Sequence, residues 1–284
     1  MQDKFSLILL AAGGLVILAG LWFLFGRQAV EPEPQVQTEQ QEQQVSGQEQ
    51  GQVIAQEVEY SNGVAGYLAK PAPSPDGAGA YPAVILIHEW WGLNDDIKSM
   101  ADRFAEQGYV ALAVDMYKGE STTDSARARE LSGAVRNDTE GAFENLRSAV
   151  DYLRQLPEVD EEKLASVGWC FGGQWSYQMA TNNLGTAASV MYYGQFDPED
   201  DFASMRAHIL VHFGEEDSSI AIDNVQEFQA ALNSTNGMHE VYVYPNVGHG
   251  FANERGGTNM AYSKEAAELA WTRTQEFLSK VLNQ

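Results

Sequence analysis

The chain has a single cysteine, Cys170, among its 284 residues. One thiol excludes an intramolecular disulfide and any zinc or iron–sulfur site that needs several cysteines. An inert buried thiol, an intermolecular bridge and a nucleophile remain as its three possible uses. Because free cysteine is among the most buried residue types, support for a nucleophile has to come from the neighbouring residues.

Basic residues are also scarce, since 17 lysines and arginines stand against 40 aspartates and glutamates, for a formal charge of -23 at pH 7. A charge of this sign repels nucleic-acid phosphates and anionic lipid surfaces. The composition therefore argues against a nucleic-acid partner. It is typical of a well-solvated surface, including one adapted to high salt.

One uncharged and mostly apolar run occupies residues 5–25 and is long enough to cross a bilayer as a helix. It closes on bulky aromatic and aliphatic residues instead of a small-residue cleavage site, which favours an uncleaved anchor over residues 1–27. Lys4 and Arg27 flank the run and give no clear orientation. The acidic segment that follows favours a single-pass protein whose domain lies on the periplasmic or extracellular side.

Residues 28–52 are dominated by glutamine and glutamate, include Pro32 and Pro34, and hold almost nothing that could enter a core. This composition predicts a disordered linker. The remaining residues, 53–284, are enough for one globular domain with a sizeable core. We expect that domain to be a monomer.

Patterns typical of strands and helices alternate beyond residue 53. The predicted strands are 53–60, 63–71, 82–88, 109–115, 164–169, 187–194, 208–214 and 239–245, the first two forming a hairpin. The predicted helices are 97–105, ending near Gly108, then 141–156, 171–181, 225–232 and 261–282. This alternation predicts an α/β fold with a mainly parallel sheet, helices on both faces and a ligand site at the carboxyl ends of the strands.

Cys170 lies in the motif GWCFGG, directly after a predicted strand and directly before a predicted helix. In the nucleophile turn of α/β-hydrolases, small residues stand two before and two after the nucleophile because the backbone segments approach closely. Gly168 and Gly172 occupy these places. The start of the following helix would favour a thiolate and a developing oxyanion.

A thiol nucleophile needs a base, and His249 is the best candidate. It lies in the motif GHGF, after the strand predicted at residues 239–245 and at the same end of the sheet as Cys170. His88 ends a strand and is a second candidate. The remaining histidines open strands or lie within one, and we interpret them as packing or edge residues: His208, His212 and His239.

The base needs a carboxylate that orients it, and Asp217 follows the strand predicted at residues 208–214. The chain order is then nucleophile, acid, histidine, as in α/β-hydrolases. Glu215 and Glu216 are alternatives, although charged loop residues are usually solvated. Asp115 follows another strand and is interpreted as a structural loop residue.

Four separated motifs together resemble the dienelactone hydrolase family, and the resemblance runs from about residue 53 to the end of the chain. They are HEWWGLN at 88–94, GWCFGG at 168–173, GEED at 214–217 and GHGF at 248–251. The resemblance implies hydrolysis of a small ester or lactone with no cofactor and no metal. It also implies roles for six residues: a triad of Cys170, Asp217 and His249, an active-site glutamate, Glu89, that controls the protonation of the thiol, and an oxyanion hole made by the backbone N–H groups of Trp90 and Phe171.

Glu89 can also be judged from its neighbours. A carboxyl group between an imidazole and two tryptophans, at the end of a strand, would lie in a partly apolar cleft that raises its pKa. That would make Glu89 a plausible proton acceptor, whereas its alternative role is a salt-bridged loop residue. Trp91 is expected to line the substrate pocket, although large aromatic residues more often serve packing.

One position departs from the family pattern. Family members that act on dienelactone hold its carboxylate with an arginine four residues after the catalytic histidine, and this chain has Asn253 there. Arg255, or Arg127 with Arg129, are the candidates to replace that cation. The departure predicts a substrate other than dienelactone, with a preference for neutral esters or lactones.

Two hypotheses of other classes remain open at this point. The chain could be a non-catalytic, membrane-tethered binding protein on a hydrolase fold, since a fold does not fix a function. It could instead carry a redox-active surface thiol, which requires an exposed and reactive Cys170 and no ester turnover. An intact nucleophile, acid and base favour the hydrolase.

Overall fold

The computed structural model describes residues 52–73, 80–255 and 262–283. The predicted anchor over residues 1–27 and nearly all of the predicted linker over 28–52 lie outside the described residues. No helix within the described ranges is both long enough and apolar enough to cross a membrane. The account that follows therefore concerns the domain predicted from residue 53 onward.

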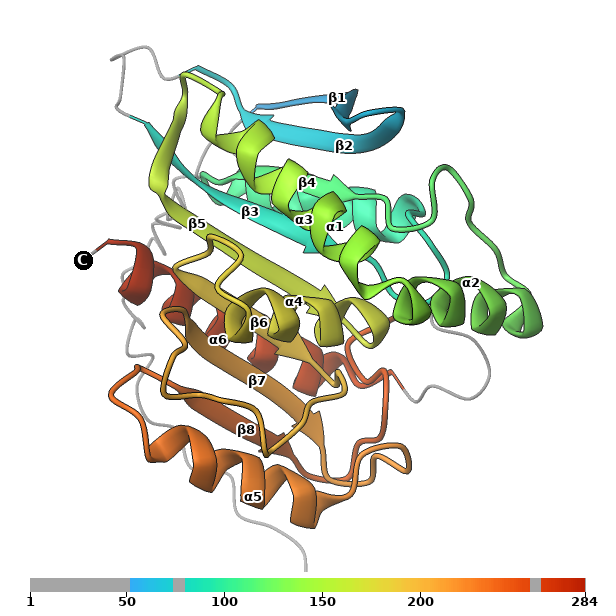
Figure 1. Ribbon diagram of the computed structural model, residues 1–284, viewed down its shortest axis with the longest axis vertical. Coiled ribbons are helices and arrows are strands. Elements are labelled where there is room, and N and C mark those ends of the chain that lie inside the picture. Colours follow the sequence, from blue (N-terminus) through green and yellow to red (C-terminus); the bar gives the residue numbers. More distant parts are fainter. Residues whose placement is uncertain (1–51, 74–79, 256–261, 284) are drawn as a thin grey trace, which may run out of the picture. The chain divides into compact units, whose positions relative to one another are not determined.

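Eight strands form one sheet in the order β1-β2-β4-β3-β5-β6-β7-β8 (Figure 1). Strands β1 and β2 form the predicted hairpin, β2 pairs antiparallel with β4, and all other pairs are parallel. The mainly parallel sheet predicted from the alternation of elements is confirmed. The bounds are β1 Val53–Ser61, β2 Val64–Pro71, β3 Tyr81–Ile87, β4 Val110–Val114, β5 Val159–Trp169, β6 Ala188–Tyr192, β7 His208–Gly214 and β8 Glu240–Tyr244.

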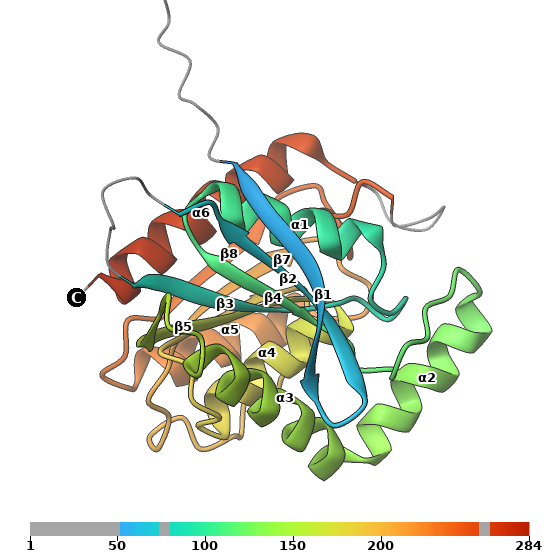
Figure 2. The same ribbon diagram turned by 90° about the horizontal axis from the view of Figure 1, so that it is seen from above.

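Helices cover both faces of the sheet, as predicted. Helices α1 and α6 pack on one face, and α3, α4 and α5 pack on the other (Figure 2). The inner strands are deeply buried and mainly apolar, since β4 and β6 are buried at every position. The bounds are α1 Asp95–Glu106, α2 Ser125–Asn137, α3 Thr139–Arg154, α4 Phe171–Thr181, α5 Ile222–Asn233 and α6 Lys264–Leu282.

The start, the buried face and the end of helix α1 each follow from identifiable residues in the sequence. Its buried residues recur on one face, and the Asn94 side chain caps the helix by accepting the backbone N–H of Ile97 at 3.3 Å. Gly108 follows the end of the helix with a φ of +90°, a conformation that favours glycine. Gly108 was predicted to end this helix, and the prediction is confirmed.

Helix α2 was not predicted from the sequence. Only Ala128 and Ser132 are fully buried in it, and Leu131 and Val135 are partly buried beside them, so its apolar stripe is short. Its start is fixed locally, because the Asp124 carboxylate accepts the backbone N–H groups of Ala126 at 2.7 Å and Arg127 at 3.0 Å. The helix projects from the side of the domain beside the carboxyl ends of the strands (Figures 1 and 2).

Other boundaries moved by a few residues. Strand β5 begins at Val159, ahead of the predicted start at 164, because its first residues include polar side chains that mask the apolar pattern. Helix α3 begins at Thr139 and is capped by Asp138, whereas the prediction began at 141. The predicted start of the last helix, residue 261, lies outside the described residues.

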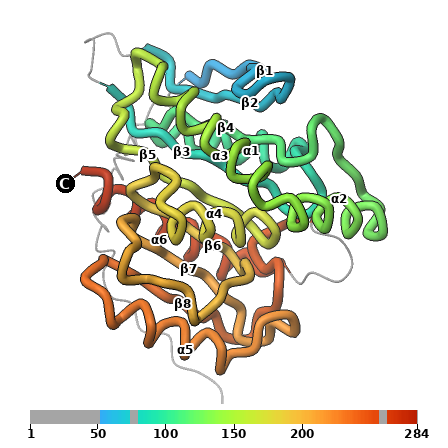
Figure 3. The backbone as a smooth tube through the Cα atoms, in the orientation of Figure 1, coloured from blue at the N-terminus to red at the C-terminus, as the bar shows by residue number. Residues whose placement is uncertain are grey.

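The parallel strands end at one edge of the sheet, and the loops that follow them gather there (Figure 3). The loops after β3, β5, β7 and β8 carry Glu89, Cys170, Asp217 and His249 respectively. Parallel topology thus brings four polar residues from distant parts of the sequence to one edge.

Candidate active site

Cys170 lies at a strained turn between β5 and α4, with a φ of +53° and a ψ of -112°. A Cβ atom added to Gly168 would lie 2.0 Å from the carbonyl oxygen of Gly172, and one added to Gly172 would lie 2.1 Å from that of Ile87. Neither position has room for a side chain. The close approach of backbone segments, which the sequence analysis gave as the reason for both glycines, is therefore present in the structure.

Three side chains form a continuous chain of contacts at this turn. His249 Nε2 lies 3.1 Å from Cys170 Sγ, and His249 Nδ1 lies 2.8 Å from Asp217 Oδ2. The other carboxylate oxygen of Asp217 accepts the backbone N–H of Ser219 at 2.8 Å. The Asp217 side chain is fully buried, so its direction toward the imidazole is fixed.

The surroundings of His249 favour its charged form. Burial disfavours an imidazolium, but the hydrogen bonds and charges of Asp217 and Cys170 outweigh it and raise the pKa of His249 to about 10. A protonated ring donates through both nitrogens, so the sulfur is then the acceptor. The arrangement therefore favours a protonated imidazole at neutral pH, with Nε2 directed at the sulfur.

Glu89 lies directly beyond β3 and is almost fully buried. Burial raises its pKa to about 7, against the lowering effect of hydrogen bonds from Asn253 and Tyr193 and of the nearby charge of His249. The raised pKa expected from the sequence agrees with this environment. One carboxylate oxygen accepts the side-chain amide of Asn253, and the other accepts the hydroxyl of Tyr193 at 3.3 Å.

Tyr193 was not predicted to be part of this site. It follows β6 with a φ of +40°, is fully buried, and places its ring 5.1 Å from the imidazole of His249, edge on. It therefore contacts both Glu89 and His249. The sequence placed Tyr193 inside the strand predicted at residues 187–194, whereas β6 ends at Tyr192, so the rule that selected His249 could not select Tyr193.

Trp90 follows β3 and Phe171 begins α4, and these two segments lie close together because Gly172 lies against the backbone of Ile87 and His88. Among the described residues, none accepts a hydrogen bond from the backbone N–H of Trp90 or Phe171. Both donors are thus available for a ligand oxygen. Trp91 belongs to the same turn, and its ring lies 4.6 Å from that of Trp90.

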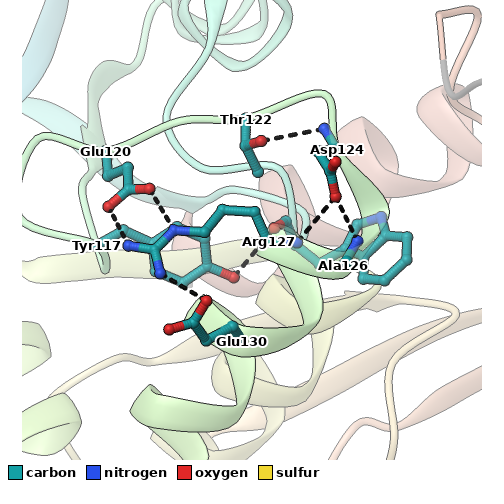
Figure 4. Close-up of polar contacts among 8 residues, drawn as sticks. Tyr117, Glu120, Thr122, Asp124, Ala126, Arg127 and Glu130 are labelled. Atoms are coloured by element: carbon teal, nitrogen blue, oxygen red, sulfur yellow. Dashed lines mark hydrogen bonds and ion pairs between the residues drawn. The ribbon is translucent and has the colours of Figure 1, made fainter.

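Two of the three arginines considered as substrate ligands, Arg127 and Arg255, are held by carboxylates, whereas Arg129 is exposed on α2. Arg127, on α2, bonds Glu120 through Nε at 2.6 Å and Nη2 at 2.7 Å, and it also contacts Glu130 at 2.7 Å (Figure 4). Arg255 pairs with Asp96 at 2.6 Å on the exposed side of the loop after β8. Neither guanidinium is left without an acidic partner.

The alternative residues have structural roles. His212 is fully buried and bonds the hydroxyls of Tyr244 at 2.9 Å and Thr274 at 3.0 Å. Asp115 accepts backbone N–H groups of the loop that follows it, as predicted. Both ring nitrogens of His88 are engaged with backbone atoms, so His88 is not free to act as the base. In the described ranges, no group of three or more His, Cys, Asp or Glu residues could hold a metal ion.

A mainly parallel sheet with helices on both faces, and with a strand–turn–helix elbow at the nucleophile position, defines an α/β-hydrolase. The sequence profile of the Dienelactone hydrolase family matches residues 64–282, and the chain belongs to that family. It is accordingly a hydrolase that acts on esters or lactones.

Individual relatives agree with this assignment. The chain is 28% identical to a Synechocystis protein whose name assigns it carboxymethylenebutenolidase activity, over 77% of this chain and 92% of the relative. It is 30% identical to a Bradyrhizobium protein named as a 2-oxo-3-(5-oxofuran-2-ylidene)propanoate lactonase, over 75% and 87% of the two chains. Among solved structures, a dienelactone hydrolase-like promiscuous phosphotriesterase from metagenomic libraries superposes with a TM-score of 0.73 at 26% identity, covering 81% of this chain and 99% of that one.

Proposed function

We propose that the protein hydrolyses a small neutral ester or lactone through a covalent acyl intermediate on Cys170. The observation that carries this proposal is the continuous contact from Cys170 through His249 to Asp217 at a strained strand–helix turn. Each of the three groups has the partner that its role requires.

In the first half of the reaction, the Cys170 thiolate attacks the carbonyl carbon and the carbonyl electron pair moves to oxygen. The N–H groups of Trp90 and Phe171 stabilise that oxyanion. As the intermediate collapses, the bond to the leaving oxygen breaks and His249 Nε2 donates its proton to that oxygen. A thioester and an alcohol result, and the alcohol stays attached when the substrate is a lactone.

In the second half, neutral His249 takes a proton from a water molecule, whose oxygen attacks the thioester. Collapse of the second intermediate expels the Cys170 thiolate and leaves an acid product, which loses its proton to solvent. Asp217 holds the imidazole in the orientation needed for both transfers and stabilises its positive charge. The thiolate–imidazolium pair is restored.

Glu89 also contributes to the proposed mechanism, although its hydrogen bonds go to Asn253 and Tyr193 and not to Cys170. Its pKa near 7 lets it change charge close to neutral pH, and its charge interacts with that of His249. We assign to ionised Glu89 the role of stabilising the imidazolium, which keeps the thiol deprotonated.

The substrate is proposed to be neutral because Asn253, an uncharged amide, stands at the position where the family has its arginine. Asn253 is an amide that bonds Glu89, while Arg127 and Arg255 are paired with carboxylates. Desolvating an unpaired carboxylate costs several kcal/mol, and the chain's charge of -23 adds a repulsive field.

The test is the pair Cys170→Ala and Cys170→Ser, assayed with small esters and lactones. The alanine variant should fold as the parent does and lose at least about a thousandfold in kcat/KM, because the covalent step is removed. Undiminished turnover by the folded alanine variant would remove the proposal. It would mean that hydrolysis does not pass through Cys170, whereas a lack of turnover by the parent would favour the non-catalytic and redox interpretations.

For the N-terminal part we propose a single-pass anchor at residues 5–25, a linker over 28–52 and a domain outside the cytoplasm. The composition of these residues supports the proposal. Membrane fractionation of the full chain and of residues 53–284 tests it, with protease added to intact cells to locate the domain. Recovery of the full chain in the soluble fraction would contradict the anchor.

A further inference from the structure

The peptide unit between Glu89 and Trp90 is held by a side chain that the proposed mechanism does not use. His88 Nδ1 lies 2.5 Å from the carbonyl oxygen of Glu89. The same peptide unit carries the N–H of Trp90, one of the two proposed oxyanion donors. Because a trans peptide is planar, with C=O and N–H pointing in opposite directions, a group that fixes the carbonyl also fixes the N–H.

The hydrogen-bonding state of His88 follows from its second nitrogen. The backbone N–H of Met116 points at His88 Nε2 across 3.1 Å, and a backbone N–H can only donate. Nε2 is therefore the acceptor, and Nδ1 carries the proton that is donated to Glu89. The ring is fully buried, and burial lowers the pKa of His88, so the neutral ring with this tautomer persists.

The imidazole of His88 also touches the residue that supplies the other donor. It stacks on the ring of Phe171 with centroids 5.7 Å apart and planes 17° apart. Its edge meets Tyr117 at 4.6 Å, and the Tyr117 hydroxyl donates to the carbonyl of Trp90 at 3.2 Å. One buried ring thus contacts both sides of the proposed oxyanion hole.

We infer that His88 is a positioning residue that aims the Trp90 N–H at the oxyanion of the transition state. This inference rests on the proposed function. The bond from Nδ1 also polarises the peptide and strengthens its N–H as a donor, since hydrogen bonds in a chain reinforce one another. The backbone N–H of Gly92 reaches the same carbonyl at 3.2 Å, so loss of His88 leaves only this longer bond.

The decisive variant is His88→Leu, examined by two reactions of the same thiol. Acylation by a p-nitrophenyl ester needs the oxyanion hole, whereas alkylation by iodoacetamide displaces iodide and forms no oxyanion. We expect acylation to slow by about ten- to hundredfold, mainly in kcat. Alkylation of Cys170 should stay within about threefold of the parent rate, because the His249 pair is untouched.

Two further variants separate the proposed positioning role of His88 from a general loss of stability. His88→Asn retains an amide donor near the place of Nδ1 and should recover most of the lost acylation. His212→Leu removes an equally buried histidine that bonds α6 instead of the oxyanion turn, so it should lower the melting temperature with no selective loss of acylation.

The inference is overturned if His88→Leu acylates at the parent rate, or if acylation and alkylation fall together. It is also overturned if a folded His88→Asn is as slow as the leucine variant. Turnover by Cys170→Ala would instead remove the proposed function itself, so the two failures are distinguishable.

Discussion

Glu89 and His249 carry the pH dependence of the site. The pKa of Glu89 is raised to about 7 by burial, and that of His249 is raised to about 10 by its partners, against the effect of burial. Above pH 7 Glu89 is ionised and supports the imidazolium, and above pH 10 His249 loses the proton that it must give to the leaving group. Activity should therefore rise through pH 7 and fall near pH 10.

Glu89→Gln is the matching variant. We expect the limb near pH 7 to disappear from its profile of kcat/KM against pH, with the limb near pH 10 retained, because kcat/KM reports the ionisations of the free enzyme. A limb near pH 7 that is unchanged in Glu89→Gln would show that another group sets it.

The charge preference of the site can be measured at Asn253. For two substrates that differ in one carboxylate, the parent should prefer the neutral one in kcat/KM. Asn253→Arg should shift the ratio toward the acidic substrate by about tenfold, or about 1.4 kcal/mol. If the parent itself prefers the acidic substrate tenfold, the assignment at Asn253 is wrong, and Arg255→Ala and Arg127→Ala would show which arginine supplies the cation.

Single residues of the site were predictable to different degrees. Cys170, Asp217 and His249 each follow a strand in a parallel sheet, so sequence position alone placed them at one edge, and their side chains meet there. The contact of Tyr193 with Glu89 depends on the positive φ of Tyr193, and no local sequence pattern predicts that backbone conformation. The pairing of Arg127 with Glu120 depends on a loop whose path only the fold determines.

At the scale of the elements, the elbow is the part that tolerates least change. In Gly172→Ala the new methyl would meet backbone carbonyls at the end of β3, and neither strand nor helix can move without breaking the sheet. We expect a loss of more than about 3 kcal/mol in the free energy of unfolding. Denaturant unfolding followed by circular dichroism measures it.

Gly133→Ala on α2 is the matched control. An added Cβ there meets no atom within 4 Å, and the position is helical. Alanine should therefore raise the free energy of unfolding by about 0.5–1 kcal/mol. Equal effects of the two substitutions would show that the close approach at the elbow is not what requires glycine.

Helices and strands were predictable where burial against the core imposes a regular spacing of apolar residues. The central strands of the parallel sheet contain buried, mainly apolar runs, and α1 shows a clear apolar face, so both were found. Helix α2 is largely exposed, has only a short apolar stripe, and is stabilised by a cap and by charged pairs, so its hydrophobic pattern is weak. Only the assembled domain shows that this helix stands beside the site.

For the whole molecule, buried histidines set the response to acid. Burial lowers the pKa of His212 to about 3 and that of His239 to about 4, both below the ordinary value of 6.5. Below pH 6.5 these histidines are protonated in the unfolded chain but stay neutral in the folded chain. The free energy of unfolding is therefore highest above pH 6.5 and declines as the pH falls toward 3 to 4. His249 acts in the opposite sense, and the stability it contributes is lost as the pH rises toward 10.

A variant isolates the contribution of His212. Between pH 7 and pH 5, His212 alone should account for about 2 kcal/mol of lost unfolding free energy. His212→Gln should be less stable at pH 7 and should lose correspondingly less on acidification, as denaturant titrations at the two pH values would show. An identical pH dependence in the variant would mean that the pKa of His212 is the same in the folded and the unfolded chain.

The central claim concerns one bond, the thioester on Cys170, and its most direct test is to trap that species. The protein is mixed with a slowly hydrolysed neutral ester, quenched in acid during the first turnover, and examined by intact mass and peptide mapping. We predict one acyl group per chain, carried on the peptide that contains Cys170 and absent from Cys170→Ala. Turnover without an acyl group, or with the group on another residue, would contradict the account.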